Sequence, residues 1–255
     1  MILKNKIILI TGGASGIGQA CAMAYVQEGA TVVVIDKDAA ALQALKEQLN
    51  EPHSFLTADV TNGAAVQEAI AAILQKYGQL DAIHNNAGVA SPSKPLHETT
   101  EAEWEQVMNV NARGIFYTTR YGIAALKASR GCILNTSSLV GEIGQENHAA
   151  YAGSKGAVNA LTKAMALDYA ADGIRVNAVA PAGVWTPMLR QWSKEQPDTT
   201  RIEQYLDNIH ALGYCPEANE IAGVCAFLLS DKARFITGCI MPVSGGAELG
   251  YKHSQ

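Results

Sequence analysis

Tyr151 and Lys155 stand four residues apart in the stretch YAGSK, and their side chains could perform acid–base chemistry together. On a helix this spacing places both on one face, about one turn apart. A free phenol has a pKa near about 10, and a neighbouring ammonium lowers it. Reaching neutrality requires about 3 pKa units, or about 4 kcal/mol, of which one lysine supplies only part. A cationic cofactor ring could supply more. Taken alone, the pair is more typical of a solvated surface pair on a helix.

A glycine-rich turn at residues 12–18 follows an apolar run at residues 7–10. Glycine allows a tight turn there and lets the backbone approach a pyrophosphate at a helix N-terminus. The next expected strand, residues 31–35, ends at Asp36, where an acid binds the ribose hydroxyls of a dinucleotide. A carboxylate would repel the 2′-phosphate of NADP, so the pattern predicts NAD, although Lys37 could offset the charge. The alternative for Asp36 is a turn or helix-capping acid.

Short apolar runs alternate with amphipathic patterns along the chain, which predicts a parallel sheet covered by helices on both faces. The long helix is expected over about residues 101–127, and Pro242 indicates a sheet edge or strand end. We predict an α/β fold, a doubly wound Rossmann sheet of seven strands. It forms one domain over residues 1–255, with a helical substrate flap at about 184–215. The strands are expected near residues 7–10, 31–35, 54–56, 80–84, 132–135, 175–179 and 239–243.

Composition narrows the function classes. The chain has 255 residues, 48% of them hydrophobic, and a net charge of -5 without a basic cluster, so we expect no nucleic-acid partner. No apolar run is long enough for a membrane span, and the N-terminus runs directly into a strand without a signal peptide. The histidines and cysteines show no metal-binding spacing. Scattered cysteines predict reduced thiols in the cytoplasm, at Cys21, Cys132, Cys215, Cys225 and Cys239.

Further motifs appear in a fixed order along the chain. They are TGGASGIG at residues 11–18, NNAG at 85–88, Asn111 within NVNARG, Ser138 thirteen residues before Tyr151, and YAGSK at 151–155. Over essentially its whole length the sequence resembles the short-chain dehydrogenase/reductase family. The resemblance implies a nicotinamide-dependent oxidoreductase. Family members are commonly homotetramers, with the helices around Asn111 and Lys155 at an interface.

The resemblance implies a role for each of four catalytic residues. Tyr151 is the general base in oxidation and the acid in reduction, and Lys155 lowers its pKa and holds the nicotinamide ribose. Ser138 orients the substrate oxygen by a hydrogen bond. Asn111 breaks its helix to hold a water that links Lys155 to solvent. In isolation, a capping serine and a solvated helical asparagine would be the simpler interpretations of Ser138 and Asn111.

Cofactor contacts are predicted partly from the glycine turn and Asp36 and partly from the resemblance. One departure is Pro181-Ala182-Gly183, where the family usually has Pro-Gly. The predicted contacts are Gly12, Ser15, Gly16, Ile17, Gly18, Asp36, Asp59, Val60, Asn86, Ala87, Gly88, Tyr151, Lys155, Val184 and Thr186.

A narrower resemblance concerns the substrate. Blocks at residues 138–141, 143–145, 185–187 and 245–251 resemble the L-fucose dehydrogenase branch, which includes the enzyme also named 17-beta-hydroxysteroid dehydrogenase type 14. Polar residues between Ser138 and Tyr151 suit a hydroxylated substrate. The predicted substrate contacts are Ser138, Gln145, Tyr151 and Trp185.

Three functions therefore stand as hypotheses. The first is oxidation of an L-fucose-like aldose at the anomeric carbon to its lactone. In the second, Trp185, Leu189 and Trp192 form an apolar wall for a hydroxysteroid or another secondary alcohol. The third is a non-catalytic NAD-binding regulator, which could have lost Tyr151 or Lys155, although the chain carries both.

Overall fold

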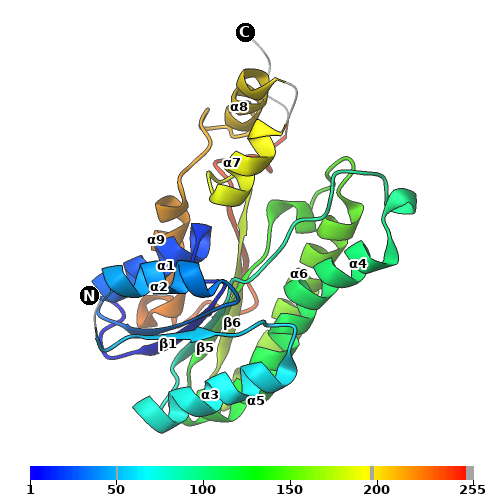
Figure 1. Cartoon of the computed structure of the whole chain (residues 1–255). Helices are drawn as coiled ribbons and strands as arrows, with labels where there is room; N and C mark the ends of the chain where they lie inside the picture. The colour runs from blue at the N-terminus through cyan, green and yellow to red at the C-terminus, as the bar shows by residue number, and fades with distance from the viewer. Residues whose placement is uncertain (50, 196–197, 251–255) are drawn as a thin grey trace.

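Seven parallel strands form one sheet in the order β3-β2-β1-β4-β5-β6-β7 (Figure 1). The computed structural model describes residues 1–49, 51–195 and 198–250. The strands are β1 (Ile7–Thr11), β2 (Thr31–Asp36), β3 (Ser54–Thr57), β4 (Ala82–Asn85), β5 (Cys132–Thr136), β6 (Arg175–Pro181) and β7 (Ile240–Val243). Because β1 pairs with β2 on one side and with β4 on the other, the strand order reverses there, and a crevice opens at the carboxyl ends. The predicted doubly wound α/β fold is confirmed.

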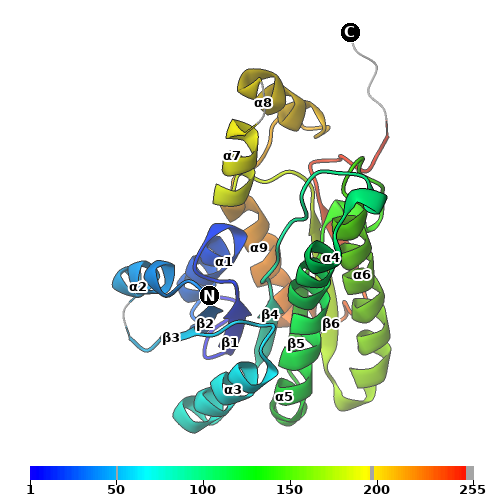
Figure 2. The same ribbon diagram turned by 45° about the vertical axis from the view of Figure 1, so that its right-hand side comes forward.

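Helices cover both faces of the sheet, as Figures 1 and 2 show from two directions. One face carries α1 (Gly16–Gln27), α2 (Ala39–Gln48) and α9 (Ala218–Leu229), and the other carries α3 (Gly63–Tyr77), α5 (Gly114–Ser129) and α6 (Ala149–Tyr169). Ile8 and Ile10 of β1 pack toward the first set and Leu9 toward the second, all with 0% exposure. A strand buried on both faces must be apolar throughout, which explains the unbroken apolar run in β1.

The predicted long helix exists but is not uniform. It consists of α4 (Glu101–Met108), a π-helical turn η2 (Asn109–Arg113), and α5. Thr100 and Glu103 form a capping box that fixes where α4 begins. A π-turn inserts one residue into the hydrogen-bond ladder, and such turns are frequent at functional sites. Asn111 lies at its centre.

The remaining elements lie mostly beyond the carboxyl ends of the strands. They are η1 (Leu96–Glu98), η3 (Leu139–Gly141), η4 (Ala170–Asp172), η5 (Asp231–Ala233), α7 (Pro187–Lys194) and α8 (Thr199–Asn208). Figure 1 shows α7 and α8 above the sheet, within the predicted flap, whose residues 196–197 lie outside the described ranges. Tyr251, used in the narrower resemblance, also lies outside them. Strand β7 is at the sheet edge, as Pro242 predicted.

Two further predictions bear on the environment of the protein. All five cysteines carry free thiols; four are buried, and Cys239 is partly exposed. Within the described ranges, every helix is too short or too polar to cross a bilayer.

Candidate functional site

The turn between β1 and α1 leads into a helix N-terminus whose first N–H groups have no side-chain cap. Gly12 and Gly16 have φ values of +61° and +54°, which side chains rarely adopt. A Cβ at Gly18 would lie 2.1 Å from the carbonyl oxygen of Gly12, so only glycine lets α1 pack this closely. Ser15 stands at the N-cap, but its hydroxyl makes no capping hydrogen bond. The first N–H groups of α1 therefore lack that partner and suit a phosphate.

Asp36 ends β2 beside this turn. Its Oδ2 accepts a hydrogen bond of 3.0 Å from the N–H of Ala14, and its Oδ1 accepts one of 3.1 Å from the N–H of Asp38. These two hydrogen bonds fix the orientation of the carboxylate beside the glycine turn. Asp36 lines the adjoining cavity, and so does Lys37, the residue that could offset its charge.

A cavity of about 1190 Å³ extends from the glycine turn to α6 and the flap. Ligand pockets typically measure about 300–1,000 Å³, so this one has room for a dinucleotide together with a small substrate. Most predicted site residues line it: Gly12, Ser15, Gly16, Ile17, Asp36, Asp59, Val60, Asn86, Ala87, Gly88, Ser138, Gln145, Tyr151, Lys155, Val184 and Thr186.

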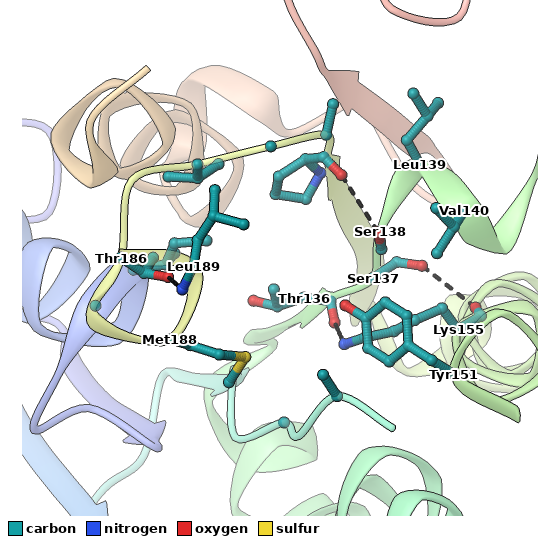
Figure 3. A pocket seen from close by; sticks show the side chains of 18 of the residues that line it. Thr136, Ser137, Ser138, Leu139, Val140, Tyr151, Lys155, Thr186, Met188 and Leu189 are labelled. Carbon is teal, nitrogen blue, oxygen red and sulfur yellow. Dashed lines mark hydrogen bonds between the residues drawn. The ribbon is translucent and has the colours of Figure 1, made fainter. Parts of the chain in front are cut away.

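Tyr151 and Lys155 project from the first turns of α6 into this cavity (Figure 3). The Nζ of Lys155 donates a 2.8 Å hydrogen bond to the carbonyl oxygen of Thr136 and lies 5.7 Å from the centroid of the Tyr151 ring. Lys155 is 4% exposed, and burial lowers its pKa to about 8. The predicted one-face arrangement of the two side chains is therefore present.

The electrostatics of Tyr151 differ from the sequence argument. Burial raises the pKa of the phenol, and the hydrogen bond with Ser138 lowers it by less. Lys155 was expected to lower this pKa, but desolvation outweighs the protein's favourable contacts. The protein's own groups thus keep Tyr151 protonated at neutral pH. A further positive charge beside the ring would lower this pKa again.

Ser138 lies directly after β5, as the N-cap of η3, and is 9% exposed. Its hydroxyl donates to the carbonyl oxygen of Pro181 at 3.4 Å, a long and weak hydrogen bond. The hydroxyl also faces Tyr151 (Figure 3). A hydroxyl held this loosely can turn toward a substrate oxygen beside the phenol.

Asn111 joins two parts of the site through its side-chain amide. Its Oδ1 accepts from the N–H of Val89 at 2.8 Å, and its Nδ2 donates to the carbonyl of Val89 and to Ser154 Oγ at 3.0 and 2.9 Å. The side chain is buried and does not line the cavity. Both N–H groups of the amide are therefore used within the protein, which leaves a second lone pair of Oδ1 and the backbone carbonyl of Asn111 as acceptors for a water. The amide thereby joins the cavity wall at Val89 to α6, while the implied role in holding a water stays a prediction.

Two other predicted contacts need correction. Trp185 is not on the cavity wall: its N–H donates to the carbonyl of Pro216 at 2.8 Å, and its ring packs 5.0 Å from the guanidinium of Arg190. Gly18 does not line the cavity either, and it acts by letting α1 approach Gly12. Residues in an irregular segment do not alternate regularly, so position alone could not tell which way Trp185 faces.

Sequence reasoning missed several polar residues of the wall. Thr136 provides the carbonyl that anchors Lys155, while Ser91 and Asn208 reach the cavity from the loop after β4 and from the end of α8. Asn208 belongs to no local motif. It reaches the cavity because of the way α8 packs above the sheet. An NTSS stretch, residues 135–138, was the one available signal for Thr136.

One cavity brings together three features of the site. They are the N-terminus of α1, which can bind a phosphate, the carboxylate of Asp36 at the end of β2, and the buried amine of Lys155 beside the phenol of Tyr151. Together they define a dinucleotide-binding oxidoreductase in which side chains of the protein handle the proton.

Comparisons with known proteins agree with this class. A family profile described as enoyl-(acyl carrier protein) reductase matches residues 12–248. L-Fucose dehydrogenase of Bos taurus is 39% identical over 97% of this chain and 91% of its own. The ligand-free structure of Thermoplasma acidophilum aldohexose dehydrogenase has a TM-score of 0.90 at 32% identity, over 99% of this chain and 98% of that one. The chain belongs to the short-chain dehydrogenase/reductase family, as the motifs predicted.

A third comparison concerns the cofactor. The structure of 3-ketoacyl-(acyl-carrier-protein) reductase from Brucella melitensis, complexed with NADH, has a TM-score of 0.88 at 31% identity, over 96% of this chain and 99% of that one. The protein is accordingly an oxidoreductase acting on CH–OH groups with a nicotinamide cofactor. This outcome sets aside the hypothesis of a non-catalytic regulator.

Proposed function

We propose that the protein is an NAD-dependent dehydrogenase that oxidises an L-fucose-like aldose at its anomeric carbon to the lactone. The observation that carries the proposal is that Ser138, Tyr151 and Lys155 share one cavity with the glycine turn. Asn111 completes the catalytic group as a positioning residue, through its hydrogen bonds to Val89 and Ser154.

The chemistry follows from the order of these groups. Ser138 orients the substrate oxygen, and Tyr151 Oη accepts its proton. Lys155 holds the cofactor ribose and the phenolate. A bound oxidised nicotinamide supplies the hydride acceptor and the positive charge that Tyr151 lacks. The C–H bond gives up a hydride and the O–H bond a proton, so the C–O bond becomes a carbonyl.

The preference for NAD over NADP rests on Asp36. Its carboxylate suits the hydroxyls of the adenosine ribose and opposes a 2′-phosphate there. Lys37 also lines the cavity and would weaken this discrimination by offsetting part of the charge. Asp59 and Val60 would border the adenine.

A sugar substrate is supported by polar side chains on the substrate half of the cavity. Gln145 and His148 come from the loop before α6, and Asn208 comes from α8. Groups placed to pair with hydroxyls reject substrates that lack them, often by about 10⁴-fold. Similarity to a mammalian L-fucose dehydrogenase and to an archaeal aldohexose dehydrogenase adds to this support.

The alternative is a hydroxysteroid or another secondary alcohol. It is favoured by the apolar part of the same wall, which comprises Val140, Ile143, Leu189, Trp192 and Ile209. These side chains could cover a flat ring system.

The remaining proposals concern context. Segment 184–215 serves as the substrate flap, because α7 and α8 contribute wall residues. The protein works as a homotetramer in the cytoplasm, where its free thiols would stay reduced.

The deciding experiment follows absorbance at the NADH band with aldoses, polyols and hydroxysteroids, each with NAD and NADP. We expect the highest kcat/KM with an L-fucose-like aldose and NAD. Faster turnover of a steroid or a simple alcohol than of any aldose would contradict the sugar proposal.

A further inference from the structure

A chain of buried and part-buried hydrogen bonds runs from the far side of the sheet to the active site. Tyr25 of α1 and His84 of β4 are both 0% exposed, and the Tyr25 hydroxyl lies 2.8 Å from His84 Nδ1. His84 Nε2 lies 2.9 Å from Thr136 Oγ1. The carbonyl oxygen of the same Thr136 accepts the hydrogen bond from Lys155. None of these contacts belongs to the proton transfer described above.

A second branch leads to the glycine turn. Thr136 Oγ1 donates to Asn86 Oδ1 at 3.3 Å. Asn86 Nδ2 donates to the carbonyl oxygens of Thr11 and Gly12 at 3.2 and 2.9 Å. Thr136 is thus the point at which the anchor of Lys155 and the support of the glycine turn meet.

The donors and acceptors allow one assignment of protons. Asn86 directs its amide nitrogen at two carbonyls, so its oxygen faces Thr136 and must accept. The hydroxyl proton of Thr136 is then used, and its oxygen must accept from His84 Nε2–H. In the neutral ring Nδ1 is left as an acceptor, so Tyr25 donates to it. Burial raises the pKa of Tyr25 well above its usual value, which keeps this donor protonated.

We propose that His84 is a positioning residue that holds Lys155 and the glycine turn in register through Thr136. Together with Asn86, its imidazole holds the threonine side chain, which restrains the backbone of residue 136 whose carbonyl receives the ammonium of Lys155. The side chain lies beneath the cavity rather than on its wall, so it touches neither substrate nor cofactor. The inference rests on the proposed function only in taking Lys155 as a catalytic group.

Two substitutions separate this role from simple packing. The amide nitrogen of glutamine can reach the position of Nε2, whereas asparagine reaches only that of Nδ1. His84→Gln therefore keeps the bond to Thr136 and loses the bond to Tyr25, and His84→Asn does the reverse. Ile83→Val is the matched control, since Ile83 is equally buried on the same strand but belongs to the opposite core.

We expect His84→Asn to weaken NADH binding, measured by fluorescence, about tenfold. The reason is that Thr136 Oγ1, which supports the glycine turn through Asn86, loses its hydrogen bond from residue 84. His84→Asn should also lower kcat about tenfold or more by misplacing Lys155. His84→Gln and Ile83→Val should stay within about threefold on both measures. Thr136→Val, which replaces the hydroxyl by a methyl group of similar size, should reproduce the loss and provides the test if either His84 variant fails to fold.

A spectroscopic measurement tests the proton assignment without turnover. In protein with nitrogen-labelled histidine, NMR should show the His84 proton on Nε2, with the signal identified by its loss in His84→Gln. A proton found only on Nδ1 would overturn the inference, and so would equal effects of the Asn and Gln variants. If the unmodified protein binds no NADH at all, the proposed function fails as well; if it binds and turns over normally, only the role of His84 is in question.

Discussion

The ammonium nitrogen of Lys155 lies 5.7 Å from the ring centroid of Tyr151, one turn further along α6. At this separation the ammonium lies close to the phenol ring, while it donates a hydrogen bond to the carbonyl oxygen of Thr136. The phenol remains protonated in the protein because burial raises its pKa. A further positive charge beside the two residues would lower the pKa of the phenol and favour its action as a base.

Replacing Tyr151 by phenylalanine should lower kcat by at least about 100-fold, because the proton acceptor is lost. Affinity for NADH should change by less than about threefold, since the ring remains and only one hydroxyl is removed. The measurement pairs steady-state absorbance with a fluorescence titration. Tyr169→Phe, near the end of the same helix, is the control. Turnover that survives Tyr151→Phe would show that the assigned base is wrong.

The buried amine predicts a pH dependence of cofactor binding. Burial lowers the pKa of Lys155 to about 8, so the ammonium predominates below that pH and the neutral amine above it. The ammonium donates stronger hydrogen bonds to the ribose oxygens than the neutral amine does, and it alone attracts the phenolate by its charge. Affinity for NADH should therefore be highest below about pH 8 and should fall as the pH rises through that value. A fluorescence titration from acid to alkaline pH measures it.

Two variants control this pH experiment. Lys155→Met should bind NADH weakly and lose the step near pH 8. Lys163→Met removes an exposed lysine of the same helix and should keep the step. An unmodified protein whose affinity does not change across pH 8 would contradict the assignment.

Asp36→Asn should shift the cofactor preference toward NADP. The amide oxygen can still accept from the N–H of Ala14, while the negative charge that opposes a 2′-phosphate is gone. The ratio of kcat/KM for NADP to that for NAD should rise at least about tenfold, because juxtaposed like charges cost several kcal/mol. Asp38→Asn is a close control, since asparagine caps α2 equally well and removes the same charge two residues away. If the ratio of kcat/KM for NADP to that for NAD changes equally in both variants, Asp36 does not determine the cofactor preference.

Sequence reasoning reached the sheet and the cofactor half of the site because those features are local. The apolar run of β1, the glycines after it and Asp36 at the end of β2 carry their own context within one strand–turn–helix–strand unit. Parallel strands then bring their carboxyl ends to one edge, so NNAG and Ser138 reach the same cavity. No knowledge of side-chain packing was needed for these positions.

What the sequence did not reveal depends on packing at a distance. The direction of Trp185, the arrival of Asn208 from α8 and the hydrogen bonds of the Asn111 amide all follow from neighbours far along the chain. The raised pKa of Tyr151 follows from burial, which a motif does not state. The contact of His84 with Thr136 joins β4 and β5 through side chains in no recognised motif.

The glycines offer a last prediction with opposite signs at two positions. A Cβ at Gly18 would lie 2.1 Å from Gly12 O and 2.5 Å from Asn86 Nδ2, and neither backbone nor amide can yield without opening the turn. Gly18→Ala should therefore lower the free energy of unfolding by several kcal/mol, on the order of an overpacked core, and should weaken NADH binding. At Gly223, in the exposed face of α9, a Cβ meets nothing within 4 Å, so Gly223→Ala should raise the free energy of unfolding by about 0.5–1 kcal/mol. Urea unfolding of both variants measures the difference. An alanine tolerated at residue 18 with unchanged NADH affinity would mean that α1 does not need its close approach to the turn.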